Sequence, residues 1–567
     1  MQKHHRLIRG MFLLLTIGFF SDNVIAQDGD LKPVTNKYAI KNATIVQAPG
    51  QIIENGALLI ENGLIKSVGA NISIPSDAWV INADSMFVYA GFISGLSNIG
   101  VEKPKEERKD LDEKLTGNPP NDYAGITPER SAADMLQANE KTISNFRQLG
   151  FTASHTVAYE GMLPGTGSII LLNGRKSEEM LYKENVSMFS QFDAAKGVYP
   201  NTVIGVMAKY RDLYRKASQA RDYSTNYDTN PAGMERPDAN STLKALYPVV
   251  NKQIPVIFKA ESIKDIMRVK ALQQDLDFTP IYGEVKQGWD AIPTFKALGS
   301  PIFLSLDYPE WKEEDKKEDE NSKKEDVKEL SPEEIEEKAL TARKMEMIKN
   351  YYTQAGIMSS RGVQFGFSTM EVKSKNFKTT LLRVIENGLS EEQALAALTT
   401  QPASILGLSS TMGTIEAGKI ANLIVSDTAY FNEKASVRYV FVDGIKYTYE
   451  AKEKKKKKSN GEEPINADGV WSYSTETPQG EGEGTITING SPGNYSGTMT
   501  LSFNNSTNDM ENIEVDGNTV SFSVKTNVGE EITINISMTI DEETFEGTLS
   551  VAEFGSFPME GFKEPEN

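Results

Sequence analysis

The residues between Gly91 and Leu406 alternate between short apolar stretches and longer stretches with helical periodicity. The pattern predicts strands within residues 202–208, 254–260, 278–283 and 300–307, and helices within residues 262–276 and 288–299. Strands separated by helices in this way pair in parallel, because each connection crosses back over the sheet. The segment 91–406 is long enough for eight such units with insertions. The sequence therefore predicts an α/β fold with a parallel (β/α)8 TIM-type barrel.

Strand-like sequence also flanks this central segment on both sides. Residues 37–90 contain short alternating runs with the turn-forming pairs Asn55-Gly56 and Asn62-Gly63, and they predict a small antiparallel sheet. Residues 407–450 again contain strand-like runs, with an Asp443-Gly444 turn between two of them. We expect the two segments to combine into one composite β-sandwich.

The remaining segments differ from the barrel in composition. Residues 310–338 form a charged insertion whose second half begins a helix at Ser331, and residues 451–466 form a linker with five consecutive lysines. Residues 467–567 show period-two runs separated by turns, which predicts a separate C-terminal all-β domain, either a small β-barrel or a β-sandwich. Its Trp471 is expected in the core; contact with a sugar or a peptide is the alternative.

Residues 1–26 have the pattern of a secretory signal peptide. A basic start is followed by the apolar run "MFLLLTIGFF" and by small residues ending at Ala26. We therefore expect the protein to be exported to the periplasm or the extracellular space. The apolar run is too short to span a bilayer, and no later run is long enough, so no membrane span is expected.

The charge of the chain restricts its partners. The formal net charge is −19, and residues 466–567 contain 18 acidic residues against 2 lysines. A surface of this sign repels phosphate backbones and anionic headgroups, which argues against nucleic acid and membrane partners. A small molecule is the expected partner, and a homo-oligomer stays possible.

Three stretches together resemble the amidohydrolase superfamily, and in particular its imidazolonepropionase-like branch. They are "ALLIENGLIKSVG" leading to "VYAGFIS", then "GLSEEQALAALTTQPASILGL", and finally "MGTIEAGKIANLIVSD". The resemblance covers Lys37 to Tyr449. It implies a metal-dependent hydrolase of non-peptide carbon–nitrogen bonds, such as cyclic amides, with zinc or another divalent metal activating water at the carboxyl ends of the barrel strands.

The metal ligands that the resemblance implies are substituted in this chain. The family carries a His-x-His pair after strand one, histidines after strands five and six, and an aspartate after strand eight. The corresponding positions here hold Leu96 and Asn98, Lys259, Tyr282 or Glu284, and Thr369, with Ser94 and Glu371 close by. The chain has no cysteine and three histidines, two of which lie in the signal peptide. One histidine cannot supply the set, so no metal site and no cofactor are predicted.

Other residues near predicted strand ends offer a different chemistry. His155, Lys259 and Glu284 are the candidate catalytic residues, since they provide a base, a nucleophile and a carboxyl group. His155 has a second interpretation, that of a buried histidine with satisfied ring nitrogens. Candidate substrate-binding residues are Asn98, Tyr282, Asp307 and Thr369. Two functions stay open: an atypical or inactive hydrolase of the family, or a pseudoenzyme that binds a ligand or another protein.

Overall fold

The computed structural model divides the chain into two compact units, Met1–Ala451 and Lys452–Asn567. It describes residues 36–103, 115–309 and 331–449 of the first unit, and residues 466–564 of the second apart from short gaps between strands. The expected signal peptide, residues 310–330 of the charged insertion and residues 451–465 of the linker lie outside the described residues. None of the described helices is long and apolar enough to cross a membrane.

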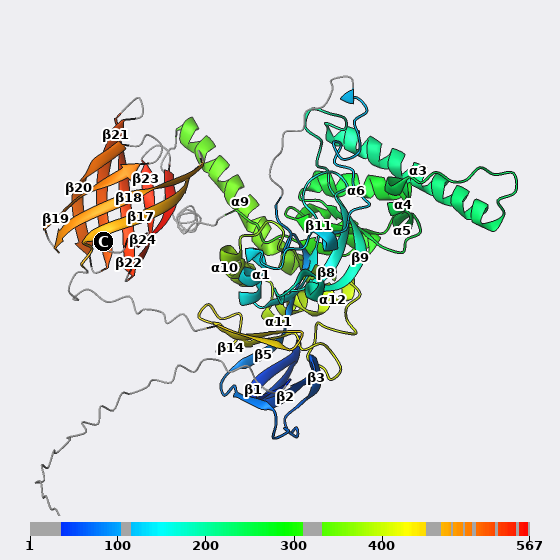
Figure 1. Ribbon diagram of the computed structural model, residues 1–567. Helices are drawn as coiled ribbons and strands as arrows, with labels where there is room; N and C mark the ends of the chain where they lie inside the picture. Colours follow the sequence, from blue (N-terminus) through cyan, green and yellow to red (C-terminus); the bar gives the residue numbers. More distant parts are fainter. Residues whose placement is uncertain are drawn as a thin grey trace, which may run out of the picture. The chain divides into compact units, whose positions relative to one another are not determined.

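Eight strands form the central sheet of the first unit (Figure 1). Their sequence order is also their order in the sheet: β6 (Phe92–Ser97), β7 (Phe151–Thr156), β8 (Gly165–Leu171), β9 (Leu181–Ser190), β10 (Val256–Lys259), β11 (Pro280–Val285), β12 (Ile302–Leu304) and β13 (Phe365–Phe367). The two edge strands meet, because the backbone N–H of Thr369 donates to the carbonyl oxygen of Leu96 at 2.9 Å. The sheet therefore curls into a barrel.

The prediction of a uniformly parallel sheet is wrong at one strand. β8 runs antiparallel to both β7 and β9, whereas the other neighbouring strands are parallel. The reason is the length of the connections. Only residues 157–164 join β7 to β8, and the β8–β9 connection holds just the four-residue helix α2 (Ser177–Met180). Neither is long enough for a crossover helix, so the chain turns back on itself.

Residues 202–208, predicted as a strand, instead begin the helix α3 (Val203–Thr229). The Thr202 side chain caps its start by accepting a hydrogen bond from the backbone N–H of Gly205 at 3.1 Å. Downstream, Val206, Tyr210 and Leu213 are buried at helical spacing. A short β-branched run does not distinguish a strand from a helix. The Thr202 cap and the helical spacing of the buried residues that follow it favour the helix.

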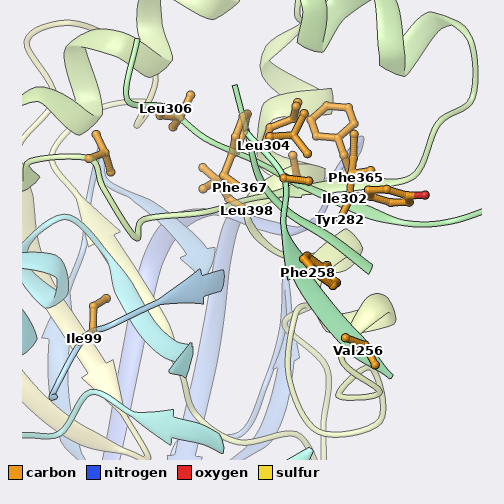
Figure 2. Close-up of a cluster of buried hydrophobic side chains, with 14 of the residues drawn as sticks. Ile99, Val256, Phe258, Tyr282, Ile302, Leu304, Leu306, Phe365, Phe367 and Leu398 are labelled. Atoms are coloured by element: carbon orange, nitrogen blue, oxygen red, sulfur yellow. The ribbon is translucent and has the colours of Figure 1, made fainter. Parts of the chain in front are cut away.

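The other helices follow or precede barrel strands. They are η2 (Ala132–Met135), α1 (Lys141–Gln148), α4 (Ser241–Ala245), α5 (Tyr247–Val250), α6 (Ile263–Leu276), η3 (Trp289–Ala291), α7 (Ile292–Leu298), α9 (Pro332–Ser360), α10 (Ser374–Glu386), α11 (Glu391–Leu398) and α12 (Thr400–Ile405). The helices predicted within 262–276 and 288–299, and the helix start at Ser331, are confirmed. A continuous apolar core lies between these helices and the strands (Figure 2).

The flanking segments combine into one eight-stranded sheet. Its order is β16 (Ile445–Thr448), β15 (Val437–Val442), β14 (Leu423–Ser426), β5 (Phe87–Ala90), β1 (Lys37–Ala48), β2 (Gln51–Glu61) and β3 (Leu64–Gly69), with β4 (Trp79–Asn82) also paired to β1. The predicted antiparallel pairing within 37–90 is confirmed for β1 with β2 and for β2 with β3, but it is wrong for β4 and β5, which pair with β1 in parallel. At twelve residues, β1 is long enough to pair with β4 along its first half and with β5 along its second.

Two of the three predicted turns of this sheet are present. Asn62-Gly63 joins β2 to β3 and Asp443-Gly444 joins β15 to β16, with positive φ at both residues of each pair. Asn55-Gly56 lies inside β2 instead, next to register shifts around Ala43 of β1. It therefore forms a bulge, for which the positive φ of Asn55 is equally suited.

The second unit is a closed barrel of eight antiparallel strands, in agreement with the predicted β-barrel. The strands are β17 (Gly469–Thr477), β18 (Gly480–Ser491), β19 (Asn494–Leu501), β20 (Ser506–Asp516), β21 (Thr519–Asn527), β22 (Glu531–Asp541), β23 (Thr544–Val551) and β24 (Gly555–Lys563), and β24 pairs with β17 to close the ring. Trp471 is buried in its core, where the indole N–H donates to the Ala467 carbonyl oxygen at 3.0 Å.

Candidate functional site

Charged side chains gather where the parallel barrel strands end. Counted from β6, the fifth strand β10 ends at Lys259, the sixth strand β11 contains Glu284, and Asp307 follows the seventh strand β12. Glu371 follows the eighth strand β13. Because the carboxyl ends of parallel strands meet at one edge, residues far apart in the sequence come together there.

Three of these residues, Lys259, Asp307 and Glu371, form the mouth ion cluster together with Glu261 and Lys286, which follow β10 and β11. The Lys259 ammonium pairs with the Glu371 carboxylate and lies 4.0 Å from Glu261. The Lys286 ammonium lies 2.7 Å from both Asp307 and Glu371 and 3.1 Å from Glu261. Two cations are thus shared among three carboxylates, which gives the cluster one net negative charge.

The cluster fixes the protonation states of Lys259 and Glu371. Burial lowers the pKa of Lys259, but the hydrogen bond to Glu371 and the nearby carboxylates outweigh it and raise the pKa above the ordinary value. Burial raises the pKa of Glu371, but the hydrogen bonds from Lys259 and Lys286 dominate and lower it to about 2. Lys259 is therefore an ammonium and Glu371 a carboxylate at neutral pH, which suits ion pairing and does not suit a nucleophile or a base.

A cavity of about 600 Å³ opens beside the cluster. Lys259, Glu261 and Glu371 line one part of it. The rest is lined by amides, aromatic rings and further charged or apolar residues: Asn98, Gln191, Tyr159, Phe189, Phe192, Lys103, Glu160, Asp193, Asp265, Ala158, Val203 and Met370. This volume is in the range that small-molecule sites occupy. We call this space the mouth cavity.

Glu284 lies beneath the mouth and is fully buried. One carboxylate oxygen accepts from the Ser305 hydroxyl at 2.5 Å, and the other accepts from the Ser368 hydroxyl. Burial raises the pKa of Glu284 to about 7, although both serine hydrogen bonds act in the opposite direction. Its φ of 51° is in the left-handed region, at a register shift between β11 and β12. A non-glycine residue held there in a buried strand stores strain, and such strain concentrates at functional sites.

The structure places two predicted site residues away from the mouth cavity. His155 is buried, with Nε2 at 2.7 Å from the Ser187 hydroxyl and Nδ1 without a partner among the described residues. Burial lowers the pKa of His155 to about 3, so the ring is neutral and closed off from solvent. Tyr282 lies in the apolar core together with Ile302 and Phe365 (Figure 2). The predicted catalytic role of His155 and the predicted substrate contact of Tyr282 therefore find no support in this geometry.

The remaining predicted residues divide between the cavity and its frame. Asn98 lines the cavity, whereas Asp307 belongs to the mouth ion cluster. Thr369 is buried, and its hydroxyl lies 2.8 Å from that of Ser94, where it joins β13 to β6. Thr369 therefore closes the barrel and does not line the cavity.

Most residues that line the cavity were not found by sequence reasoning, among them Phe189 and Gln191, and neither was Lys286 of the ion cluster. Lys286 lies two residues after Glu284, and this strand-end position was the available signal. Phe189 and Gln191 lie at the end of β9, whose first half is polar and only partly buried. A strand of this kind has no continuous apolar run, so its end could not be located from the sequence.

The residues at the strand ends do not fit the metal that the resemblance implies. Leu96 is a buried apolar side chain, and the Asn98 amide donates to the Val157 carbonyl oxygen at 2.7 Å. Lys259 brings a positive charge to the fifth strand end, where a metal would need a neutral or negative ligand. Across the described residues, no group of three or more His, Cys, Asp or Glu side chains is placed to hold a metal ion.

Comparisons with known proteins show what the first unit is similar to. Residues 328–446 match the amidohydrolase family. A solved amidohydrolase from Thermotoga maritima MSB8 shares 20% identity, with a TM-score of 0.59, over 73% of this chain and 100% of that one.

Two other solved structures are more distant. They are a prolidase complexed with N-methylphosphonate-L-proline (15% identity, TM-score 0.43, 73% of this chain and 100% of that one) and a putative prolidase from Bifidobacterium longum (16%, 0.40, 74% and 96%). Likenesses of this degree do not bear on the chemistry. No curated protein matches the chain. The first unit therefore has the fold of the solved Thermotoga maritima amidohydrolase, and residues 328–446 match the amidohydrolase family.

Proposed function

We propose that the first unit binds a small molecule in the mouth cavity and does not carry out the metal-dependent hydrolysis typical of its fold. The observation that carries this proposal is the ion pair between Lys259 and Glu371. It lies at the fifth and eighth strand ends, where the resemblance implies metal ligands. An ammonium in that position repels a divalent cation and offers a ligand a charged hydrogen-bond donor.

The protonation states support binding over catalysis. Hydrolysis needs a group that takes a proton from water near neutral pH. Glu371, with its pKa lowered to about 2, is too weak a base, and Lys259 is already protonated. Each of these side chains instead presents a fixed charge to the cavity.

A second candidate function is the hydrolysis of a cyclic amide, as in the imidazolonepropionase-like branch. One observation favours it: the pKa of Glu284, raised to about 7, matches what a general acid or base requires. The Glu284 carboxyl group is fully buried and does not line the mouth cavity. This function therefore needs an opening of the mouth that brings water to Glu284.

The test compares metal content, ligand binding and turnover in the purified full chain. We expect no stoichiometric zinc or manganese by mass spectrometry, no change of the melting temperature on adding chelator, and no turnover of cyclic amides. A small-molecule library should contain compounds that raise the melting temperature of the chain. The Lys259→Met variant should lose this effect, and Lys252→Met, which removes an exposed lysine paired with Asp277, should keep it. Chelator-sensitive turnover would refute the proposal.

We further propose that the chain is exported and that residues 1–26 are removed. An apolar run of ten residues with a basic start and small residues before Gln27 supports this. Mass spectrometry of the protein from its native host should give a mature chain beginning at Gln27. A full-length chain in the cytoplasmic fraction would contradict export.

A further inference from the structure

We infer that the ligand of the mouth cavity is a small zwitterion, an organic ammonium that also carries a carboxylate, as an amino acid does. This inference rests on the proposed function, since it assumes that the mouth cavity binds a ligand. It is drawn from which hydrogen-bonding atoms of the cavity lining are already engaged and which are available.

The two amides of the cavity present acceptors. Asn98 donates its amide N–H to the Val157 carbonyl oxygen at 2.7 Å, and Gln191 donates to the Gly161 carbonyl oxygen at 2.9 Å. These bonds fix the orientation of both amides, and the carbonyl oxygens of the two side chains receive no hydrogen bond from the described residues. A ligand that meets them must bring donors.

The carboxylates of the lining add negatively charged acceptors. The Glu261 side chain is 40% exposed and that of Glu371 is 33% exposed, although both contact lysines. A carboxylate offers about four lone-pair positions, so each retains capacity for a further donor. Three further carboxylates of the lining, Glu160, Asp193 and Asp265, add to the negative charge, and together these acceptors favour an ammonium group.

Lys103 and Lys259 are the lysines of the lining, and Lys259 supplies the opposite charge next to Glu371. Its ammonium has three donors, of which Glu371 engages one, and Glu261 at 4.0 Å is beyond hydrogen-bond reach. A ligand carboxylate beside Lys259 would therefore find a partly exposed cation. The pairing of Lys259 with Glu371 places the two recognition charges next to each other, which matches the short separation of the charged groups in an amino acid.

Part of the remaining wall is aromatic. Phe189, Phe192 and Tyr159 line the same cavity, and the Phe192 ring packs on that of Phe258 with a centroid separation of 4.6 Å. Aromatic walls favour an apolar side chain on the ligand and also attract an ammonium group.

Ligands of a single charge are disfavoured by the same lining. A plain carboxylate would leave the amide oxygens unpaired and would face Glu261 and Glu371. A plain amine would meet the Lys259 ammonium. A ligand that leaves a buried polar group unpaired, or that opposes a like charge, is rejected strongly.

The experiment uses the full chain and a matched set of three probes: L-leucine, its decarboxylated analogue isoamylamine and its deaminated analogue 4-methylpentanoate. The common amino acids are first screened by thermal shift, and the binder with the largest shift replaces L-leucine together with its own two analogues. Calorimetry should give a Kd below about 1 mM for the amino acid and at least about tenfold weaker binding for each analogue.

Variants separate the two charges of the ligand. Lys259→Met should weaken binding of the amino acid about tenfold and strengthen binding of the amine, because the like charge is removed, whereas Glu261→Gln should weaken binding of both about equally. Glu261 is partly exposed, so its variant keeps the test valid if Lys259→Met does not fold. Lys252→Met is the matched control and should bind as the unaltered chain does.

The outcomes distinguish this inference from the proposed function. If an anion or a neutral compound binds and Lys259→Met abolishes its binding, the cavity binds a ligand but the zwitterion is wrong. If none of the amino acids binds below about 1 mM, the ligand class is likewise overturned. Chelator-sensitive turnover would overturn the proposed function itself.

Discussion

Replacing Glu284 with glutamine should change how the stability of the first unit depends on pH. Glu284 is fully buried and forms no ion pair with any of the described residues, and burial raises its pKa from the ordinary 4.5 to about 7. One pKa unit corresponds to about 1.4 kcal/mol, so the rise amounts to about 3 kcal/mol. The charged groups that act on it are Glu371, which raises the pKa, and Lys286, which lowers it.

The direction follows from which state holds the proton. Between pH 4.5 and about 7 the folded state keeps a proton on Glu284 that the unfolded state has lost. Stability therefore falls as the pH rises through this window, and the contribution of the protonated carboxyl group is complete only below pH 4.5. Glutamine is neutral throughout and still provides an acceptor for one serine hydroxyl. Between pH 4.5 and pH 8, the free energy of unfolding of the Glu284→Gln variant should rise by about 3 kcal/mol relative to that of the unaltered chain.

Urea unfolding followed by hydrogen-exchange mass spectrometry of peptides from β10 to β12 measures this quantity. The peptide resolution separates the first unit from the C-terminal barrel, which has its own core. Glu386→Gln changes an exposed glutamate of α10 and serves as the control. A free-energy difference between Glu284→Gln and the unaltered chain that stays constant across this pH range would refute the reasoning.

Substitutions at three further positions test a contact inside the first barrel, the core of the C-terminal barrel and a helix cap. Gly95→Ala should destabilise the barrel by about 1–3 kcal/mol in a thermal melt, since the added Cβ would lie 2.0 Å from a ring carbon of Phe303; an unchanged melting temperature would contradict this contact. Trp471→Ala should cost about 3–5 kcal/mol in the C-terminal barrel alone, and exchange rates in the first unit should not change. Ser262→Ala removes the capping box that Ser262 forms with Asp265 at the start of α6 and should cost about 1 kcal/mol in urea unfolding, whereas Ser262→Asp should retain most of the stability.

Local sequence was sufficient to predict an element where its pattern is compatible with a single secondary structure. The capped helix at 263–276 and the period-two strands of the C-terminal barrel were predictable, because capping residues and alternation fix the local backbone directly. The first turn of α3 and the Asn55-Gly56 bulge were not predictable, since the same residues suit a strand or a turn equally well. At both positions, contacts with residues distant in the sequence determined the local structure.

The residues of the candidate site were likewise predictable only in part from the local sequence. Placing Lys259, Glu284 and Asp307 near strand ends required only the apolar runs that precede them. The sequence could not tell that Lys259 would pair with Glu371, 112 residues away, or that the ring of His155 would be enclosed against Ser187. Such partners depend on how the barrel closes.

By itself, the sequence determined several helices and strands, such as α6 and the strands of the C-terminal barrel, and the chemical groups available at the strand ends, including too few histidines for the metal site that the resemblance implies. The tertiary structure alone decided that β8 reverses direction, that Glu284 is buried while Glu371 remains ionised, and that two lysines share three carboxylates at the mouth. The physical reason is that backbone preferences act over a few residues, whereas burial and electrostatic pairing depend on distances that only the folded chain sets.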